Sequence, residues 1–186
     1  MSTALLLIDI QNDYFPGGAM ELVGSVEAGE QAGSLLAACR AQGLPVIHIQ
    51  HLANQAGATF FRPGTPGAAI HACVAPAPGE VVFQKHYPSS FRETGLLAHL
   101  REQGIDALIV AGMMTHMCID TTVRAAFDLG FTCTLAHDAC ATRDLAFGGR
   151  SVAAADVHTA FIAALNRFAR LQSSSEIRAQ LEATPR

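Results

Sequence analysis

Short, continuously apolar segments alternate with helical segments along the whole chain, and this alternation restricts the possible fold most. The first apolar segment, Ala4–Ile8, reads ALLLI and shows no alternation of polar and apolar residues. Such a strand needs cover on both faces, as parallel strands between two layers of helices have. Strands are predicted at Ala4–Asp9, Pro45–His51, Glu80–Gln84, Ala107–Ala111 and Phe131–Ala136, with a shorter one at Ala169–Gln172.

The segments between these strands have helical character. Helices are predicted around Val26–Gln42, Arg92–Gln103, Met117–Leu129 and Arg150–Phe168, and from Ser175 onward. Parallel strands joined by right-handed crossovers carry helices on both faces of the sheet. We therefore expect an α/β protein of three layers, α/β/α, with a mostly parallel, six-stranded, Rossmann-like sheet, in a single domain over residues 1–186. The irregular segment from Ala53 to Gly79 is long enough to be a lid or an interface segment.

Composition and charge exclude several classes of protein. Half of the residues are apolar, which excludes a disordered chain, and the net charge of −4 provides no basic face for nucleic acid. The mean hydropathy of +0.27 favours burial of apolar surface in a homo-oligomer. The first apolar run ends at Asp9 and follows no basic residue, so neither a signal peptide nor a membrane segment is expected. The five cysteines form no CxxC pair, and reduced thiols in the cytoplasm are the simplest interpretation.

Reactive side chains stand where predicted strands end. In an open parallel sheet, ligands bind beyond the carboxyl ends of the strands. Asp9 ends the first strand, Lys85 follows the third and Cys118 comes shortly after the fourth. Taken singly, Asp9 could be a turn cap and Lys85 a surface lysine. A carboxylate beside an apolar strand end is a good proton acceptor, however, and a buried ammonium needs an anionic partner.

Cys118 has the strongest local argument for a chemical role. It is predicted to lie in the first turn of a helix, where backbone N–H groups and the helix dipole favour the thiolate and lower the pKa. The same N–H groups could hold an oxyanion. The other cysteines, Cys39, Cys73, Cys133 and Cys140, are interpreted as structural.

Three segments around these residues resemble the signature regions of the isochorismatase-like cysteine hydrolases, a superfamily that includes nicotinamidase-type amidases. They are Leu7–Tyr14 (LIDIQNDY), Gln84–Phe91 (QKHYPSSF) and Val110–Thr121 (VAGMMTHMCIDT). The segments Arg124–Gly130 (RAAFDLG), His137–Arg143 (HDACATR) and Val157–Ala164 (VHTAFIAA) also fit, so the resemblance extends almost to the last helix.

The resemblance implies an Asp–Lys–Cys triad. Asp9 would accept the proton of Cys118, Lys85 would orient Asp9, and Cys118 would attack a carbonyl carbon to form a thioester that water then hydrolyses. It also implies a cis peptide bond at Met113–Met114 and an oxyanion hole made by the backbone N–H groups of Met114 and Cys118.

Two departures bear on the substrate. Metal-dependent nicotinamidases share an Asp-x-His motif after the second strand, where this chain reads Gln50-His51-Leu52-Ala53. His48, His51 and His71 remain possible ligands, but no metal and no cofactor is predicted. True isochorismatases cleave a vinyl ether, and several lack the cysteine, so Cys118 favours cleavage of a C–N bond.

Apolar and aromatic residues near these positions are candidate substrate contacts. They are Tyr14, Phe61, Phe91 and Met117, each of which could equally serve in core packing. Such surroundings favour a small neutral amide as the substrate. The alternatives are hydrolysis of an ether or a ureide, and a thiol redox sensor that uses Cys118 without turnover. A flavodoxin-like nucleotide binder is disfavoured because QNDYFPGG after the first strand is no GxGxxG loop.

Overall fold

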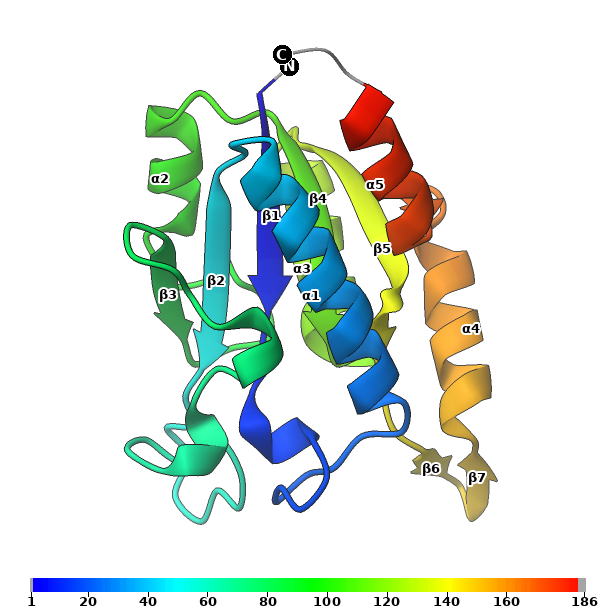
Figure 1. Ribbon diagram of the computed structural model, residues 1–186. Helices are drawn as coiled ribbons and strands as arrows, with labels where there is room; N and C mark the ends of the chain where they lie inside the picture. The colour runs from blue at the N-terminus through cyan, green and yellow to red at the C-terminus, as the bar shows by residue number, and fades with distance from the viewer. Residues whose placement is uncertain (1, 184–186) are drawn as a thin grey trace.

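The computed structural model describes residues 2–183 and is built around one parallel sheet of six strands (Figure 1). The strand order is β3-β2-β1-β4-β5-β8, and every neighbouring pair is parallel. The strands are β1 (Thr3–Ile8), β2 (Val46–His51), β3 (Val81–Lys85), β4 (Ala107–Met113), β5 (Thr132–Ala141) and β8 (Arg170–Gln172). The predicted α/β class and the six-stranded sheet are confirmed.

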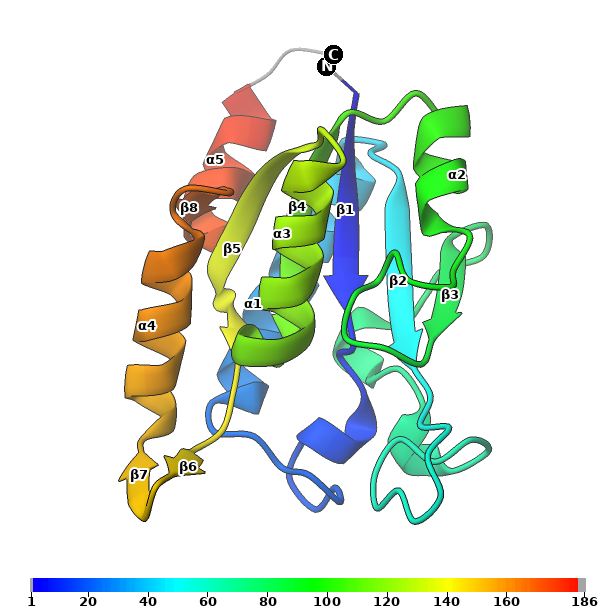
Figure 2. The same cartoon turned by 180° about the vertical axis from the view of Figure 1, so that it is seen from behind.

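Helices cover both faces of this sheet. Helices α1 (Ser25–Ala41) and α5 (Ser174–Ala183) lie on the face seen in Figure 1. Helices α2 (Leu96–Glu102), α3 (Asp120–Asp128) and α4 (Ala154–Leu165) lie on the opposite face, seen in Figure 2. Strand β1 contributes side chains to the hydrophobic core on each face of the sheet. Leu5 and Leu7 pack in the core beneath α1, whereas Leu6 and Ile8 pack in the core beneath α2 and α3. Burial on both faces explains why β1 is uniformly apolar.

The predicted helix over Arg150–Phe168 begins too early. Residues Arg150–Val152 form strand β7, which pairs antiparallel with β6 (Leu145–Phe147), and α4 begins only at Ala154. The turn between the two strands is Gly148-Gly149, with φ angles of 57° and 76°. Two consecutive positive φ angles are typical of a tight hairpin turn, and glycine adopts them without a steric penalty.

The helix predicted over Arg92–Gln103 also begins later, at Leu96. Glu93 has a φ of 55°, in the left-handed region, so the backbone cannot continue as an α-helix through it. Thr94 accepts a hydrogen bond from the Leu96 amide (3.3 Å) and donates one to the Ser90 carbonyl (2.6 Å), which fixes the entry into α2.

The loops that follow β1 and β2 meet at the carboxyl end of the sheet, the lower end in Figure 1. Asp13, in the short helix Asn12–Tyr14 after β1, accepts hydrogen bonds from the amides of Phe61 (2.6 Å) and Ala19 (3.2 Å). Phe61 belongs to the long segment between β2 and β3. The buried carboxylate of Asp13 therefore ties this segment to the end of β1.

None of the helices within residues 2–183 combines the length and the apolar character needed to cross a bilayer.

Candidate active site

Asp9 is the first residue after β1 and lies at the carboxyl end of the sheet. It is fully buried, and its amide donates to the Ile49 carbonyl of β2 (3.0 Å). Its φ of 53° bends the chain away from the strand direction, and aspartate tolerates this left-handed conformation better than most residues. The bend at Asp9 ends the strand after Ile8 and holds the carboxylate at the carboxyl end of the sheet.

Lys85 ends β3, and its ammonium group lies between the other two members of the predicted triad. Nζ is 2.7 Å from Oδ2 of Asp9 and 3.2 Å from Sγ of Cys118, and it also donates to the Tyr87 carbonyl (3.1 Å). The residue is only 1% exposed. Burial by itself lowers the pKa of Lys85, but the adjacent Asp9 carboxylate and Cys118 sulfur outweigh burial and raise the pKa above its usual value. The side chain is therefore an ammonium ion with a carboxylate partner.

Cys118 lies in a π-helical turn, Thr115–Ile119, between β4 and α3. The α-helix itself begins at Asp120, so Cys118 is not in its first turn as predicted. The expected fall in the thiol pKa is also wrong. Burial, with the neighbouring Asp9 charge, raises the pKa of Cys118 well above its ordinary value. The resting group is a thiol with a carboxylate beside it, not a preformed thiolate.

The segment that carries Cys118 has an unusual backbone. The Met113–Met114 peptide bond is cis, and the Met114 carbonyl accepts from the amides of Met117 (3.0 Å) and Ile119 (3.3 Å). These two bonds close the turn around Met114, so the amides of Met114 and Cys118 belong to the same compact turn as the sulfur.

A cavity of about 380 Å³ opens at Cys118. Three of the four predicted substrate contacts, Tyr14, Phe61 and Met117, line it, and the rings of Tyr14 and Phe61 are 4.5 Å apart between centroids. The remaining lining residues are His51, Ala53, Asn54, Gln55, Ala56, Gly57, Ala58, Thr59, Phe60, His86, Pro88, Met114 and Cys118. Most of them come from the long segment after β2, which forms one wall of the cavity.

Phe91 is placed elsewhere. Its ring stacks on Phe131 with centroids 6.0 Å apart, and it packs on the core beneath α2 and α3. The neighbouring Ser90 explains the difference, because its amide and hydroxyl are both bonded to the Thr122 hydroxyl of α3 (3.0 Å each). This contact directs the segment after Lys85 toward α3 and leaves Phe91 in a packing role.

The three histidines considered as metal ligands do not come together. His48 contacts Glu80 (Nε2 to Oε2, 2.9 Å), and His71 stacks on Phe15 with its Nδ1 3.1 Å from Sγ of Cys73. Only His51 lies at the site, where its donor atom and those of Asp9 and Cys118 are within 4.8 Å of one another.

The position between the donor atoms of Asp9, His51 and Cys118 is filled by Lys85. Its Nζ is 2.7 Å from Oδ2 of Asp9, 3.1 Å from Nδ1 of His51 and 3.2 Å from Sγ of Cys118. The positive charge that contacts the carboxylate of Asp9, the imidazole of His51 and the sulfur of Cys118 is thus the ammonium group of Lys85.

Sequence reasoning missed the place of His51 beside Lys85 and the role of Gln11. His51 pairs with Lys85 in the register of β2 and β3, and Gln11 is bonded to the His51 backbone. The rule that polar residues at strand ends meet at one edge would have found His51, which ends β2 as Lys85 ends β3. For Gln11 the sequence contains no comparable signal.

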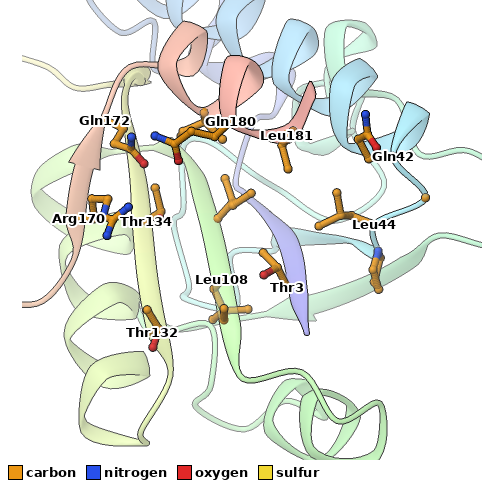
Figure 3. A pocket seen from close by; sticks show the side chains of 15 residues that line it. Thr3, Gln42, Leu44, Leu108, Thr132, Thr134, Arg170, Gln172, Gln180 and Leu181 are labelled. Carbon is orange, nitrogen blue, oxygen red and sulfur yellow. The ribbon is translucent and has the colours of Figure 1, made fainter. Parts of the chain in front are cut away.

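A larger cavity, of about 600 Å³, lies at the opposite end of the sheet (Figure 3). It lies between α5 and the starts of the strands, with Thr3, Thr132 and Arg170 at the beginnings of β1, β5 and β8. Threonine, glutamine, leucine, isoleucine, alanine, proline, glycine and arginine residues line it. Because no cysteine, histidine or carboxylate is among these residues, the smaller cavity at Cys118 is the candidate active site.

Comparisons with known proteins identify the family of this chain. The model of the isochorismatase domain matches residues 3–176. The chain is 49% identical over 166 residues to the uncharacterized isochorismatase family protein YddQ of Bacillus subtilis, covering 89% of this chain and 92% of that protein. It is 38% identical over 144 residues to the maleamate amidohydrolase of Pseudomonas putida, covering 69% of this chain and 67% of that enzyme.

The crystal structure of an isochorismatase-family hydrolase from Oleispira antarctica superposes with a TM-score of 0.92 at 51% identity, covering 96% of each chain. Together with the match of the domain model over residues 3–176, this similarity shows that the chain belongs to the isochorismatase family of hydrolases.

Proposed function

We propose that this hydrolase cleaves the C–N bond of a small neutral amide through a thioester on Cys118. The observation that carries the proposal is the position of the Lys85 ammonium, which contacts both Asp9 (2.7 Å) and Cys118 (3.2 Å), and Cys118 lines the cavity. A thiol redox sensor needs only an activated thiol, whereas this arrangement adds a buried base and a cation. The amidohydrolase among the relatives supports C–N chemistry.

In the first half of the reaction, Asp9 accepts the Cys118 proton as the sulfur attacks the amide carbon. The raised pKa of Cys118 means that the proton leaves only as the new C–S bond forms. Oδ1 of Asp9 has no hydrogen-bond partner within residues 2–183 and is the available acceptor. The negative charge moves from Asp9 to the carbonyl oxygen, where the Met114 and Cys118 amides stabilise it.

Collapse of the tetrahedral intermediate breaks the C–N bond and leaves the acyl group on sulfur. The departing nitrogen takes the proton from Asp9 and leaves as ammonia or an amine. Water then attacks the thioester carbon, with Asp9 again accepting a proton, and the carboxylic acid leaves as Cys118 regains its thiol. Lys85 stays protonated throughout and holds Asp9 in position.

The cavity supports a small substrate without charge. Its walls are the rings of Tyr14, Phe60 and Phe61 and the side chain of Met117, and no Arg, Lys, Asp or Glu is among its lining residues. A volume of about 380 Å³ is at the small end for ligand sites, about 300–1,000 Å³.

The test is ammonia release from a panel of small amides that includes nicotinamide, pyrazinamide and ureides. The Cys118→Ala variant is expected to lose at least about 10³-fold in kcat/KM. Cys133→Ala, which removes a buried thiol from β5, is the matched control and is expected to retain activity. Wild-type protein incubated with substrate and quenched is expected to gain the mass of the acyl group on Cys118.

A parallel set with a chelator separates metal-dependent from metal-free turnover, and undiminished rates are expected. Ammonia release that survives in Cys118→Ala would contradict the mechanism. Absence of ammonia from every amide, with cleavage of an ether instead, would contradict the assignment of the bond.

A further inference from the structure

His51 is held at the active site by its backbone. It ends β2 and pairs with Lys85 in the parallel register of β2 and β3. Its amide donates to Oε1 of Gln11 (2.7 Å), and its carbonyl accepts from Nε2 of the same side chain (2.9 Å). Gln11 is fully buried and also donates to the Ala68 carbonyl (2.8 Å), so its own position is fixed. These contacts fix the backbone from which the imidazole projects.

The contact with Lys85 decides which imidazole nitrogen carries the proton. Nδ1 of His51 is 3.1 Å from Nζ of Lys85. An ammonium group has donors and no acceptor, so Nδ1 must accept, and the proton of the neutral ring lies on Nε2. Burial and the Lys85 charge lower the pKa of His51 to about 4, which keeps the ring neutral near pH 7.

The remaining ring nitrogen is a donor without a partner among residues 2–183, where no hydrogen bond from Nε2 of His51 occurs. His51 lines the cavity together with Tyr14, Phe61 and Cys118. Since Nδ1 faces Lys85, Nε2–H is the polar group that the ring offers to a ligand in the cavity.

A second imidazole at the cavity has the opposite polarity. His86, an exposed residue, has Nδ1 2.7 Å from the Leu52 carbonyl. A carbonyl accepts, so Nδ1 of His86 donates, and Nε2 of its neutral ring is an acceptor. The donor Nε2–H of His51 therefore belongs to a half-buried ring whose other nitrogen contacts Lys85, whereas the acceptor of His86 belongs to an exposed side chain.

We propose that His51 determines specificity by donating a hydrogen bond from Nε2–H to an acceptor on the substrate body. The inference rests on the proposed function and narrows its substrate class. The preferred substrates are small neutral amides that carry, beside the scissile amide, a carbonyl oxygen or an unprotonated ring nitrogen.

The tautomer is tested directly by ¹⁵N NMR of the imidazoles, with His51→Gln identifying the resonances. The expected spectrum has an unprotonated Nδ1 and a protonated Nε2 for His51 at pH 7. A proton on Nδ1, or a doubly protonated ring at pH 7, would overturn the proposal. This readout does not depend on turnover.

Ligand contact is tested in Cys118→Ala with two amides that differ at one ring atom, nicotinamide and benzamide. Nicotinamide has a ring nitrogen where benzamide has a C–H group. The Nε2–H signal of His51 is expected to shift with nicotinamide and to stay in place with benzamide. Equal responses, including no response to either amide, would overturn the proposal.

Kinetics separate the donor from a merely structural effect. His51→Asn keeps an acceptor for Lys85 at the Nδ1 position and has no group at the Nε2 position, whereas His51→Gln keeps a donor there. The ratio of KM for benzamide to KM for nicotinamide is expected to fall roughly three- to tenfold in His51→Asn, the range of one neutral hydrogen bond. In His51→Gln most of the ratio is expected to remain.

An unchanged ratio in His51→Asn would overturn the specificity role even if ammonia release continues. Failure of the proposed function has a different signature, because no amide then releases ammonia in a Cys118-dependent way. In that case the two NMR experiments still decide whether Nε2–H of His51 contacts an acceptor-bearing ligand.

Discussion

At the scale of single residues, the site depends on a charge pair removed from water. Asp9 is fully buried and Lys85 nearly so, and their charged atoms are 2.7 Å apart. Ions in such a position are costly to bury, and removing one partner leaves the other uncompensated. The pair therefore affects both catalysis and folding.

We predict that Lys85→Met destabilises the fold by about 3–5 kcal/mol, because it leaves a buried carboxylate without a cation. The double variant Asp9→Asn, Lys85→Met is expected to be more stable than Lys85→Met alone, since it removes both charges. Urea denaturation of the two single variants and the double variant measures the coupling. Strict additivity of the single changes would show that the ion pair contributes nothing.

The raised pKa of Cys118 predicts slow alkylation near neutral pH. Iodoacetamide reacts with the thiolate, and burial beside Asp9 disfavours that form at pH 7. The rate at Cys118, followed by mass spectrometry, is expected to rise through the alkaline range without a plateau near the usual thiol pKa of about 8.5. A plateau below pH 7 would instead indicate a preformed thiolate.

At the scale of elements, the long segment after β2 forms one wall of the active site and is anchored by Asp13. The carboxylate accepts from the Phe61 amide (2.6 Å), and Phe61 has a φ of 53°. This left-handed backbone is uncommon for a bulky residue and needs the surrounding contacts to maintain it. The wall of the cavity thus depends on a residue outside it.

Asp13→Ala is predicted to raise KM for the best amide more than it lowers kcat, because Phe61 loses its anchor while the triad keeps its contacts. The free energy of unfolding is expected to fall by about 1–3 kcal/mol, the cost of leaving a buried donor unsatisfied. Limited proteolysis is expected to cut first between residues 53 and 79. Unchanged KM and an unchanged cleavage pattern would count against the anchoring role.

The lowered pKa of Glu80, the residue before β3, makes the stability of the fold depend on pH. Arg40 of α1 donates to both of its carboxylate oxygens (2.7 and 2.8 Å), and these bonds lower the pKa of Glu80 to about 2 from an ordinary 4.5. A carboxylate whose pKa is depressed in the folded state stabilises the fold above pH 4.5, and this contribution is lost as the pH falls toward 2.

Glu80→Gln is therefore expected to be less stable than the wild type at pH 7, by about 1 kcal/mol, since Arg40 is partly exposed to solvent. At pH 2 most of the difference is expected to be lost, because the carboxyl is then about half protonated in the folded state and almost fully protonated in the unfolded state. Thermal denaturation from pH 2 to 7 measures it. A constant difference across this range would rule out the charge as its source.

At the scale of the whole molecule, the central strands β1 and β4 pair at a point where their backbones come unusually close together. Gly112 of β4 pairs with Ile8 of β1 and has a φ of 142°. A Cβ at this position would overlap the Ile8 carbonyl oxygen. This contact lies one residue before Asp9, so the backbone beneath the active site has no room for a side chain.

Gly112→Ala is predicted to destabilise the fold by about 4 kcal/mol or more or to prevent soluble expression, because two central strands must separate. Gly130→Ala is the matched control, since its φ of 89° is also positive but a Cβ there meets no atom within 4 Å. It is expected to cost only about 1 kcal/mol. Equal effects of the two substitutions, measured by urea denaturation, would show that backbone strain matters more than the steric overlap.

Continuous apolar runs were enough to predict the sheet. Segments such as Ala107–Ala111 predict a strand buried on both faces, and the positions at or shortly after the strand ends predict that Asp9, Lys85 and Cys118 meet. The hairpin at Gly148-Gly149 was missed because it has only three residues on each side, too few for a pattern.

The rest of the site depends on tertiary contacts that no local pattern contains. The placement of Phe91 depends on a bond between Ser90 and Thr122, which are 32 residues apart. The raised pKa of Cys118 results mainly from burial by other elements of the fold. The lowered pKa predicted from the sequence was based only on the helix that follows the residue. The self-association predicted from the hydropathy of the chain stays a prediction, which sedimentation velocity can check.

The position of β3 in the sheet has a consequence for how activity reports on folding. Lys85 belongs to this edge strand, and its ammonium must cross over β2 to meet Asp9 beyond the end of β1. Side chains of a strand alternate between faces, so a slip of β3 by one residue against β2 would turn Lys85 to the wrong face of the sheet. Edge strands also open most readily, and each local opening of β3 separates the charge pair while the central strands stay folded. The turnover rate therefore depends on the register of β3 against β2. Hydrogen exchange of the β3 amides measures how often this strand opens, and each open molecule lacks the Asp9–Lys85 contact.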